Sequence, residues 1–137
     1  MTVFVDTSVW FAAANVRDRY NRRAKQLFAE IDTPLLTDHV LIEAWQLLNS
    51  RVHRQAAEGF WLGVRRGVAE LQKVTSADLE AAWSIGEVFP DQNFSIVDRT
   101  SFAVMERLGL TRAASFDDDF AVYRYGRKRD KAFAVLR

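Results

Sequence analysis

The stretch "TVFVDTSVW", residues 2–10, sets the start of the fold. It opens with an apolar, β-branched run that is typical of a buried strand, and Asp6 ends that run. Thr7 or Ser8 is placed to cap the helix that is expected to follow this strand. We therefore predict a strand-to-helix junction with a carboxylate at the carboxyl end of the first strand.

The rest of the chain repeats this alternation of short strands and helices. Further strands are expected at Leu35–Leu36 and within "AELQKVT" (69–75), "RAASF" (112–116) and "AFAVL" (132–136). Helices are expected at 18–31, from Thr37 or Asp38 to Arg51, and at 54–67, 76–89, 95–108 and 120–124. Such alternation favours right-handed crossovers. We predict a Rossmann-like α/β fold with three layers, α/β/α, around a central, mostly parallel sheet of roughly four to five strands.

Size and composition narrow the class of protein. With 137 residues, 49% of them hydrophobic, and no linker or repeat, we expect one domain over residues 1–137. The absence of cysteine excludes disulfides, thiolate metal sites and cysteine nucleophiles. The longest apolar run, Val9–Ala14, is far too short to span a bilayer, and no signal peptide is indicated, so we expect a cytoplasmic protein. The net charge of +1 means that binding to a charged partner must depend on local patches.

Carboxylates from separate parts of the chain are expected to meet at one end of the sheet. Asp6 and Asp117 each follow a predicted strand. Glu43 lies early in the helix after the second strand, and Asp98 lies in the first turn of its helix. Ligands of open parallel sheets bind at the carboxyl ends of the strands. These side chains are therefore expected to share a pocket.

Each acid also has a purely structural interpretation. Asp6 can cap the helix after the first strand, Glu43 can be a solvated helix residue, and Asp98 can be one half of a capping box. The run Asp117–Asp119 can be a turn with favourable helix-dipole placement, and for Asp118 we expect this structural role. The joint pattern of the acids favours a functional site over these separate interpretations.

A shared acidic pocket points to a divalent cation. Carboxylates at close range raise one another's pKa and destabilise the fold unless a positive charge lies among them. Oxygen ligands without a thiolate suit Mg²⁺ or Mn²⁺, and a chain whose only histidines are His39 and His53 disfavours a histidine-rich zinc centre. Such an ion activates water and grips phosphate, so the predicted reaction is hydrolysis of a phosphodiester.

Four acidic motifs occur in order along essentially the whole chain: "FVDTSVW" (4–10), "LTDHVLIEAWQLL" (36–48), "FSIVDRTSFAVM" (94–105) and "ASFDDDF" (114–120). This set resembles the motifs of PIN-domain ribonucleases, and specifically those of VapC toxins from bacterial VapBC toxin–antitoxin pairs. The resemblance implies a PIN-like fold and an endoribonuclease that cleaves a transfer RNA or ribosomal RNA loop and arrests translation. It also implies a homodimer, and inhibition by a cognate VapB antitoxin whose C-terminal segment covers the acidic site.

The same resemblance implies roles for individual residues. It implies an Mg²⁺- or Mn²⁺-dependent catalytic centre made of Asp6, Glu43, Asp98 and Asp117. Of these, Asp6, Asp98 and Asp117 are expected to bind the metal, and Glu43 to position or deprotonate the attacking water. The side chains expected to support them are Thr7, Ser95 and Asp119.

The basic segment "YRYGRKRDK", residues 123–131, follows the last acidic motif. An RNA nuclease needs positive charge near its carboxylates, because the carboxylates by themselves repel the phosphates of the substrate. Contacts to RNA are therefore expected from Arg124, Arg127, Lys128 and Arg129. Tyr123 and Tyr125 are expected to stack on unpaired bases. A solvated basic face without a role in binding is the alternative.

Other classes of acidic site fit the sequence less well. A receiver-like signalling module, which is not an enzyme, carries adjacent acids after its first strand and a lysine after its last core strand. Here Thr7 follows Asp6, and Asp117 stands where that lysine is needed. A phosphatase with an aspartyl nucleophile needs a second aspartate at the position of Ser8. The remaining alternative is a PIN-fold nuclease or RNA-binding protein outside a toxin–antitoxin system.

Overall fold

A five-stranded parallel sheet lies at the centre of the computed structural model, which describes residues 1–137. The strand order is β3-β2-β1-β4-β7, and every neighbouring pair is parallel. The strands are β1 (Thr2–Val5), β2 (Thr33–Thr37), β3 (Glu70–Gln72), β4 (Arg112–Ala114) and β7 (Ala134–Leu136). The order extends from β1 to both sides, so the direction of winding reverses between β1 and β4. Open α/β sheets bind ligands at this kind of reversal.

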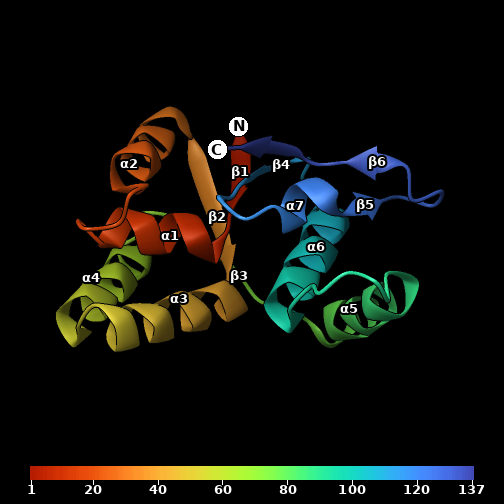
Figure 1. Cartoon of the computed structure of the whole chain (residues 1–137), viewed down its shortest axis with the longest axis horizontal. Helices are drawn as coiled ribbons and strands as arrows, with labels where there is room; N and C mark the ends of the chain where they lie inside the picture. Colours follow the sequence, from red (N-terminus) through yellow and green to blue (C-terminus); the bar gives the residue numbers. More distant parts are fainter.

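Helices cover both faces of the sheet. They are α1 (Thr7–Ala14), α2 (Asn21–Glu30), α3 (Asp38–Arg51), α4 (Arg54–Arg65), α5 (Ser76–Val88), α6 (Ile96–Leu108) and α7 (Asp119–Val122). Figure 1 shows α1, α2 and α4 on one side of the strands and α6 with α7 on the other, while α3 runs from the end of β2 beneath α1. The predicted three-layer α/β/α fold is confirmed. None of the helices has the length and apolar composition that crossing a membrane requires.

The junction after β1 brings a carboxylate to the end of the strand. The indole N–H of Trp10 donates to the carbonyl of Val5 at 3.0 Å, which ties the first turns of α1 back to the strand. The N-cap position is occupied by Asp6, and no side chain caps the helix. The expected cap at Thr7 or Ser8 is therefore wrong. Because the carboxylate of Asp6 makes no capping bond, it is available for other contacts.

The capping box of α6 fixes the position of Asp98. The Oγ atom of Ser95 accepts a bond from the N–H of Asp98 at 3.0 Å, and the Asp98 carboxylate accepts one from the N–H of Ser95 at 3.3 Å. The helix ends at Gly109, whose φ of 70° is left-handed, as expected for a C-cap. A second capping box, formed by Thr75 and Asp78, begins α5.

Aromatic packing holds α6, α7 and the end of the sheet together. A core cluster of 26 buried residues draws on the chain from Val3 to Phe133. Within it, the rings of Phe102 in α6 and Tyr123 stack with their centroids 4.2 Å apart, and Phe120 of α7 packs edge-on against Phe102 at 4.9 Å. These contacts place the two helices that carry the later acidic residues in a defined relation to each other.

The C-terminal region differs from the sequence-based expectation. Strands β5 (Arg124–Tyr125) and β6 (Lys131–Ala132) form an antiparallel hairpin outside the central sheet, which the residue pattern did not predict. Tyr123 was expected to stack on RNA bases, but its ring is completely buried and its hydroxyl donates to Glu106 at 2.6 Å. That expectation is wrong, because the ring fills the core beneath the hairpin.

Substitution by alanine is expected to have opposite effects on stability at two glycines. We expect Gly109→Ala to lower the free energy of unfolding by about 1 kcal/mol, because alanine is strained at a positive φ. Gly59→Ala, inside α4, meets no atom within 4 Å and is expected to raise it by about 0.5 to 1 kcal/mol. Urea denaturation of both variants measures the difference. Changes of the same sign would contradict the assigned backbone conformations.

Candidate active site

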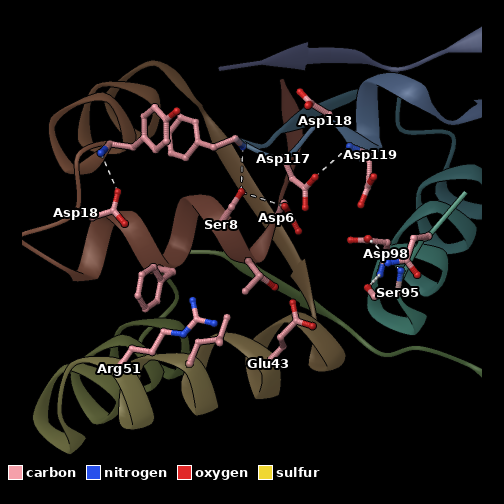
Figure 2. Close-up of a pocket in the computed structure, with 16 residues that line it drawn as sticks. Asp6, Ser8, Asp18, Glu43, Arg51, Ser95, Asp98, Asp117, Asp118 and Asp119 are labelled. Carbon is pink, nitrogen blue, oxygen red and sulfur yellow. Dashed lines mark hydrogen bonds between the residues drawn. The ribbon is translucent and has the colours of Figure 1, made fainter.

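An open cavity of about 720 Å³ lies at the carboxyl ends of β1 and β4. Of the 16 residues that line it, seven carry carboxylates: Asp6, Asp18, Glu43, Asp98, Asp117, Asp118 and Asp119. Figure 2 shows Asp6, Asp98 and Asp117 pointing toward one another, with Glu43 reaching up from α3. The structure thus brings the acids singled out in the sequence into one cavity.

The pairing of β1 with β4 explains why Asp6 lies beside the last acidic motif. Val5 is in register with Ala114, so Asp6 and Ser115 are the next residues on two adjacent strands. The Oγ–H of Ser115 donates to the Asp6 carboxylate at 2.8 Å. The same Oγ atom accepts a bond from the N–H of Asp117 at 3.0 Å. One buried hydroxyl therefore connects two of the acids.

Asp6 is a buried carboxyl that two serine hydroxyls hold in place. It is only 4% exposed, and the hydroxyl of Ser8 donates to the same carboxylate oxygen as Ser115, at 3.1 Å. Burial raises the pKa of Asp6 to about 6. The bonds from Ser115 and Ser8 act in the opposite direction, and the nearby charge of Asp117 raises the pKa further. The carboxylate of Asp6 is thus kept in the cavity at a cost in desolvation.

The tightest group of acids consists of Asp98, Asp117 and Asp119. One carboxylate oxygen from each lies within 4.8 Å of the other two. Burial raises the pKa of Asp98 to about 8, and the Asp119 carboxyl and the charge of Asp6 add to this effect. At neutral pH, Asp98 therefore binds a proton more readily than an ordinary carboxyl does. A divalent cation can replace that proton, because it prefers oxygen ligands of this kind.

The loop after β4 gives its three aspartates different environments. Asp119, expected as a supporting residue, belongs to the tight group, whereas Asp6, expected as a ligand, lies next to it. Asp118 stands at the N-cap position of α7. Its carboxylate accepts a bond from Arg137 at 3.0 Å, and its side chain is 82% exposed. Asp118 therefore faces solvent at the rim of the cavity.

Glu43 enters the cavity from a different helix. The hydroxyl of Thr37 caps α3 by accepting a bond from the N–H of Val40 at 3.1 Å, so the helix begins directly at the end of β2. Glu43 lies one turn further on and is half-buried. It takes part in none of the ion pairs of the protein. Its carboxylate is thus available to a group that enters the cavity.

The two hydroxyl residues named from the resemblance differ in their contacts. Ser95 caps α6 and holds the backbone of Asp98. Thr7 lies in the first turn of α1, and its Oγ1 atom is buried without a hydrogen-bond partner. Buried hydroxyls without a partner are rare in folded proteins. Thr7 also lines the cavity, and its unpaired Oγ1 atom lies beneath the cavity surface.

The basic residues of the C-terminal hairpin divide into two groups. The guanidinium of Arg124 donates to the carbonyl of Ala121 at 2.6 Å, at the end of α7, and that of Arg129 donates to the Tyr123 hydroxyl at 2.9 Å. Arg127 and Lys128 are exposed at the turn of the hairpin. RNA binding by this segment stays a prediction, and it rests more on the exposed pair than on the two arginines that already have partners.

Three residues that affect the charge or the position of the acids were not among the predicted site residues. Ser8 and Ser115 bond to Asp6, and Arg51 is the one basic residue among those that line the cavity. A signal was present for each serine, because Ser8 follows Asp6 by two residues and Ser115 ends an apolar strand. For Arg51 the signal is its spacing of eight residues from Glu43, which places both on the same face of a helix.

Comparison with known proteins gives a consistent result over most of the chain. A model of the PIN domain family matches residues 3–125. The 23S rRNA-specific endonuclease VapC20 of Mycobacterium tuberculosis is 38% identical over 120 residues, which is 87% of this chain and 92% of that protein. The crystal structure of VapC20, described as a toxin that cleaves the sarcin–ricin loop, superposes with a TM-score of 0.81. In that comparison the identity is 37% over 85% of this chain and 91% of the other.

A more distant solved structure shares the fold alone. VapBC2 from Rickettsia felis, bound to a DNA fragment from its promoter, gives a TM-score of 0.68 at 12% identity, over 99% of this chain and 98% of that chain. A parallel sheet with this arrangement of helices is therefore retained where most residues differ.

The raised pKa of Asp98 predicts how stability depends on pH in the absence of metal. Between about pH 4 and pH 8 the folded protein keeps a proton on Asp98 that the unfolded chain releases. The free energy of unfolding should therefore fall as the pH rises through this window. Asp98→Asn removes this titration. It is expected to stabilise the protein at pH 8 by about 1 kcal/mol or more, and to stabilise it less at pH 5.

Urea denaturation in EDTA at the two pH values measures this effect. Asp91→Asn makes the same change in charge at an exposed position outside the cavity and serves as the matched control. Equal effects of Asp98→Asn at both pH values would show that Asp98 is not crowded by the other acids.

Proposed function

This chain belongs to the PIN-domain family and, within it, to the VapC type, and we propose that it is a metal-dependent endoribonuclease toxin that cleaves 23S ribosomal RNA. The observation that carries the proposal is the convergence of Asp98, Asp117 and Asp119 within 4.8 Å, with Asp6 beside them. The choice of ribosomal over transfer RNA follows the described specificity of VapC20. The whole chain is proposed to act as one PIN domain.

The donor set fits Mg²⁺ or Mn²⁺. All of the close ligand atoms are carboxylate oxygens, and no cysteine is present. Burial raises the pKa of Asp6 and of Asp98 because it disfavours their charged forms, and a bound cation would stabilise those charged forms. We assign Asp6, Asp98 and Asp117 to the metal, with Asp119 as a further ligand or a neighbour that orients one. A bound divalent ion would polarise the phosphate and make bound water a better nucleophile.

The residues of the chain then have separate tasks in hydrolysis. Glu43 has a free, half-buried carboxylate and is assigned to orient the attacking water and accept its proton. Ser8 and Ser115 hold the carboxylate of Asp6 by their hydroxyl donors. Ser95 keeps Asp98 in place through the capping box, and Thr7, whose unpaired Oγ1 atom lies beneath the cavity surface, is assigned a supporting role. The barrier is lowered mainly because these groups are positioned before the RNA arrives.

The proposed partners follow from the VapC type. A cognate VapB-like antitoxin is expected to neutralise the toxin by covering the acidic cavity, and cleavage of ribosomal RNA would arrest translation in the cytoplasm. A homodimer is also proposed. An apolar pocket of α3 and α4, lined by Leu41, Ile42, Trp45 and Trp61, is available for such an interface, and Trp61 is 44% exposed. The alternative is a PIN nuclease or RNA-binding protein that acts outside a toxin–antitoxin pair.

Cleavage should depend on the buried and clustered acids and on metal. We expect Asp6→Asn or Asp98→Asn to reduce RNA cleavage at least roughly 100-fold, because several kcal/mol of transition-state stabilisation depend on the metal. EDTA should have the same effect on the unaltered protein. Mapping of RNA 5′ ends after brief expression of the intact protein and of Asp98→Asn shows where cleavage occurs.

Asp118→Asn is the matched control for this experiment, because Asp118 lies next to two of the proposed ligands but is paired with Arg137 and exposed. It should retain cleavage within a few-fold of the intact protein. Cleavage that survives Asp98→Asn, or that continues in EDTA, would refute the assignment. Parallel assays on RNA and DNA separate a ribonuclease from a nuclease of broader specificity.

Substitutions at Asp98 and Glu43 should have different effects: the first should weaken metal binding, and the second should slow catalysis. Calorimetric titration with Mn²⁺ is expected to show weaker binding to Asp98→Asn, since a ligand is lost. Glu43→Gln should bind Mn²⁺ within a few-fold of the intact protein, while its kcat falls roughly 100-fold or more because the proton acceptor is lost. If Glu43→Gln also loses Mn²⁺, Glu43 is a ligand and its proposed role as a base is wrong.

A further inference from the structure

One cation stands among the acids of the cavity. Arg51 is the only basic residue of the 16 that line it, although seven of the others are acidic. It takes part in none of the ion pairs of the protein. An exposed guanidinium beside so many carboxylates, yet paired with none of them, is available to an anion that enters from solvent.

The geometry of α3 sets the distance of Arg51 from the reaction centre. Glu43, Leu47 and Arg51 follow at intervals of four residues and all line the cavity, so they form one stripe along the helix. Figure 2 shows Glu43 and Arg51 rising from α3 on the same side. Eight residues of helix correspond to about 12 Å along its axis. A group bound by Arg51 therefore lies to one side of the linkage that is cleaved near Glu43, although the side chain of Arg51 leans back toward Glu43 (Figure 2).

A second hollow adjoins the cavity at Arg51, which lines both. This hollow, of about 710 Å³, is lined by Arg51 together with Arg17 and other residues of the α1–α2 loop and the start of α4. Arg17 is exposed and takes part in no ion pair. The lining thus changes from mainly acidic, near Asp98, to basic, at Arg51 and Arg17, with Asp18 as the acidic neighbour of Arg17. This change of sign suits a polyanion that is hydrolysed at one end and held at the other.

We propose that Arg51 binds a phosphate of the RNA outside the cleaved linkage, so that the substrate strand runs from the acidic centre along α3 toward Arg17. This inference rests on the proposed ribonuclease function. The guanidinium of Arg51 can form two parallel hydrogen bonds to phosphate oxygens. Such a pair of bonds fixes the orientation of the RNA strand in addition to attracting its charge.

Arg51 also stabilises its own helix, and the experiment must distinguish this effect from RNA binding. It is the basic residue in the last turn of α3, where a cation complements the helix dipole. Arg65 holds the same position in the last turn of α4 and does not line the cavity. Arg65→Gln therefore makes the same change in charge and in dipole interaction away from the proposed RNA path, and it is the matched control for Arg51→Gln.

The test uses the full chain with Asp98→Asn, so that RNA is bound but not cleaved, and a fluorescent stem-loop of the sarcin–ricin sequence. Arg51→Gln is expected to weaken binding roughly 10-fold and to reduce the slope of log affinity against log salt by about 1. Arg51→Lys should recover part of the affinity, because a point charge still attracts phosphate. Arg65→Gln should change neither the affinity nor the slope. In the cleavage-competent chain, Arg51→Gln should raise KM more than it lowers kcat.

The possible outcomes distinguish this inference from the proposed function. If the intact chain cleaves RNA in a metal-dependent way but Arg51→Gln binds RNA like Arg65→Gln, the role of Arg51 is wrong and the function stands. If Arg51→Gln weakens binding but no metal-dependent cleavage occurs, Arg51 binds RNA and the nuclease function is wrong. If the intact chain does not bind the stem-loop, both are wrong.

Discussion

The burial of neighbouring carboxylates at the end of the sheet is the constraint on which the rest of the structure depends. Pairing of β1 with β4 places Asp6 beside the loop that carries Asp117 and Asp119, and α6 brings Asp98 to the same point. Bringing these groups together out of water raises the pKa of Asp6 and of Asp98, so the site lowers the stability of the metal-free fold. A site that opposes folding requires a framework strong enough to hold it, and a bound cation would stabilise it.

The framework that holds the buried acids in place consists of hydrogen bonds from hydroxyl groups and of apolar packing. Ser115 connects Asp6 to the backbone of Asp117, so that one hydroxyl aligns two carboxylates. The capping box holds Asp98 at the start of α6. Stacking of Phe102 on Tyr123 then fixes the body of α6 against the rest of the core. The function therefore depends on apolar packing and hydroxyl donors as much as on the acids themselves.

The cavity is asymmetric, and this asymmetry matters for a polyanionic substrate. Carboxylates dominate its lining, whereas Arg51 lies at one side and also lines a second hollow together with Arg17. Because Arg51 and Glu43 lie on one helix, the spacing between their backbone positions is set by the rise of α3. A rigid element of this kind can hold the strand in register with the reacting group.

Local order was determined by the sequence itself, whereas the partners of the acids were decided only by tertiary structure. The alternation of strands and helices, the Ser95–Asp98 capping box and Gly109 could be predicted because they depend on residues close together in the chain. The bond from Ser115 to Asp6 joins residues 109 positions apart and requires the register of β1 with β4. The same holds for the burial of Tyr123, since its neighbours come from other elements. Propensity and spacing describe short-range energies, but they do not specify which distant side chains will share one desolvated space.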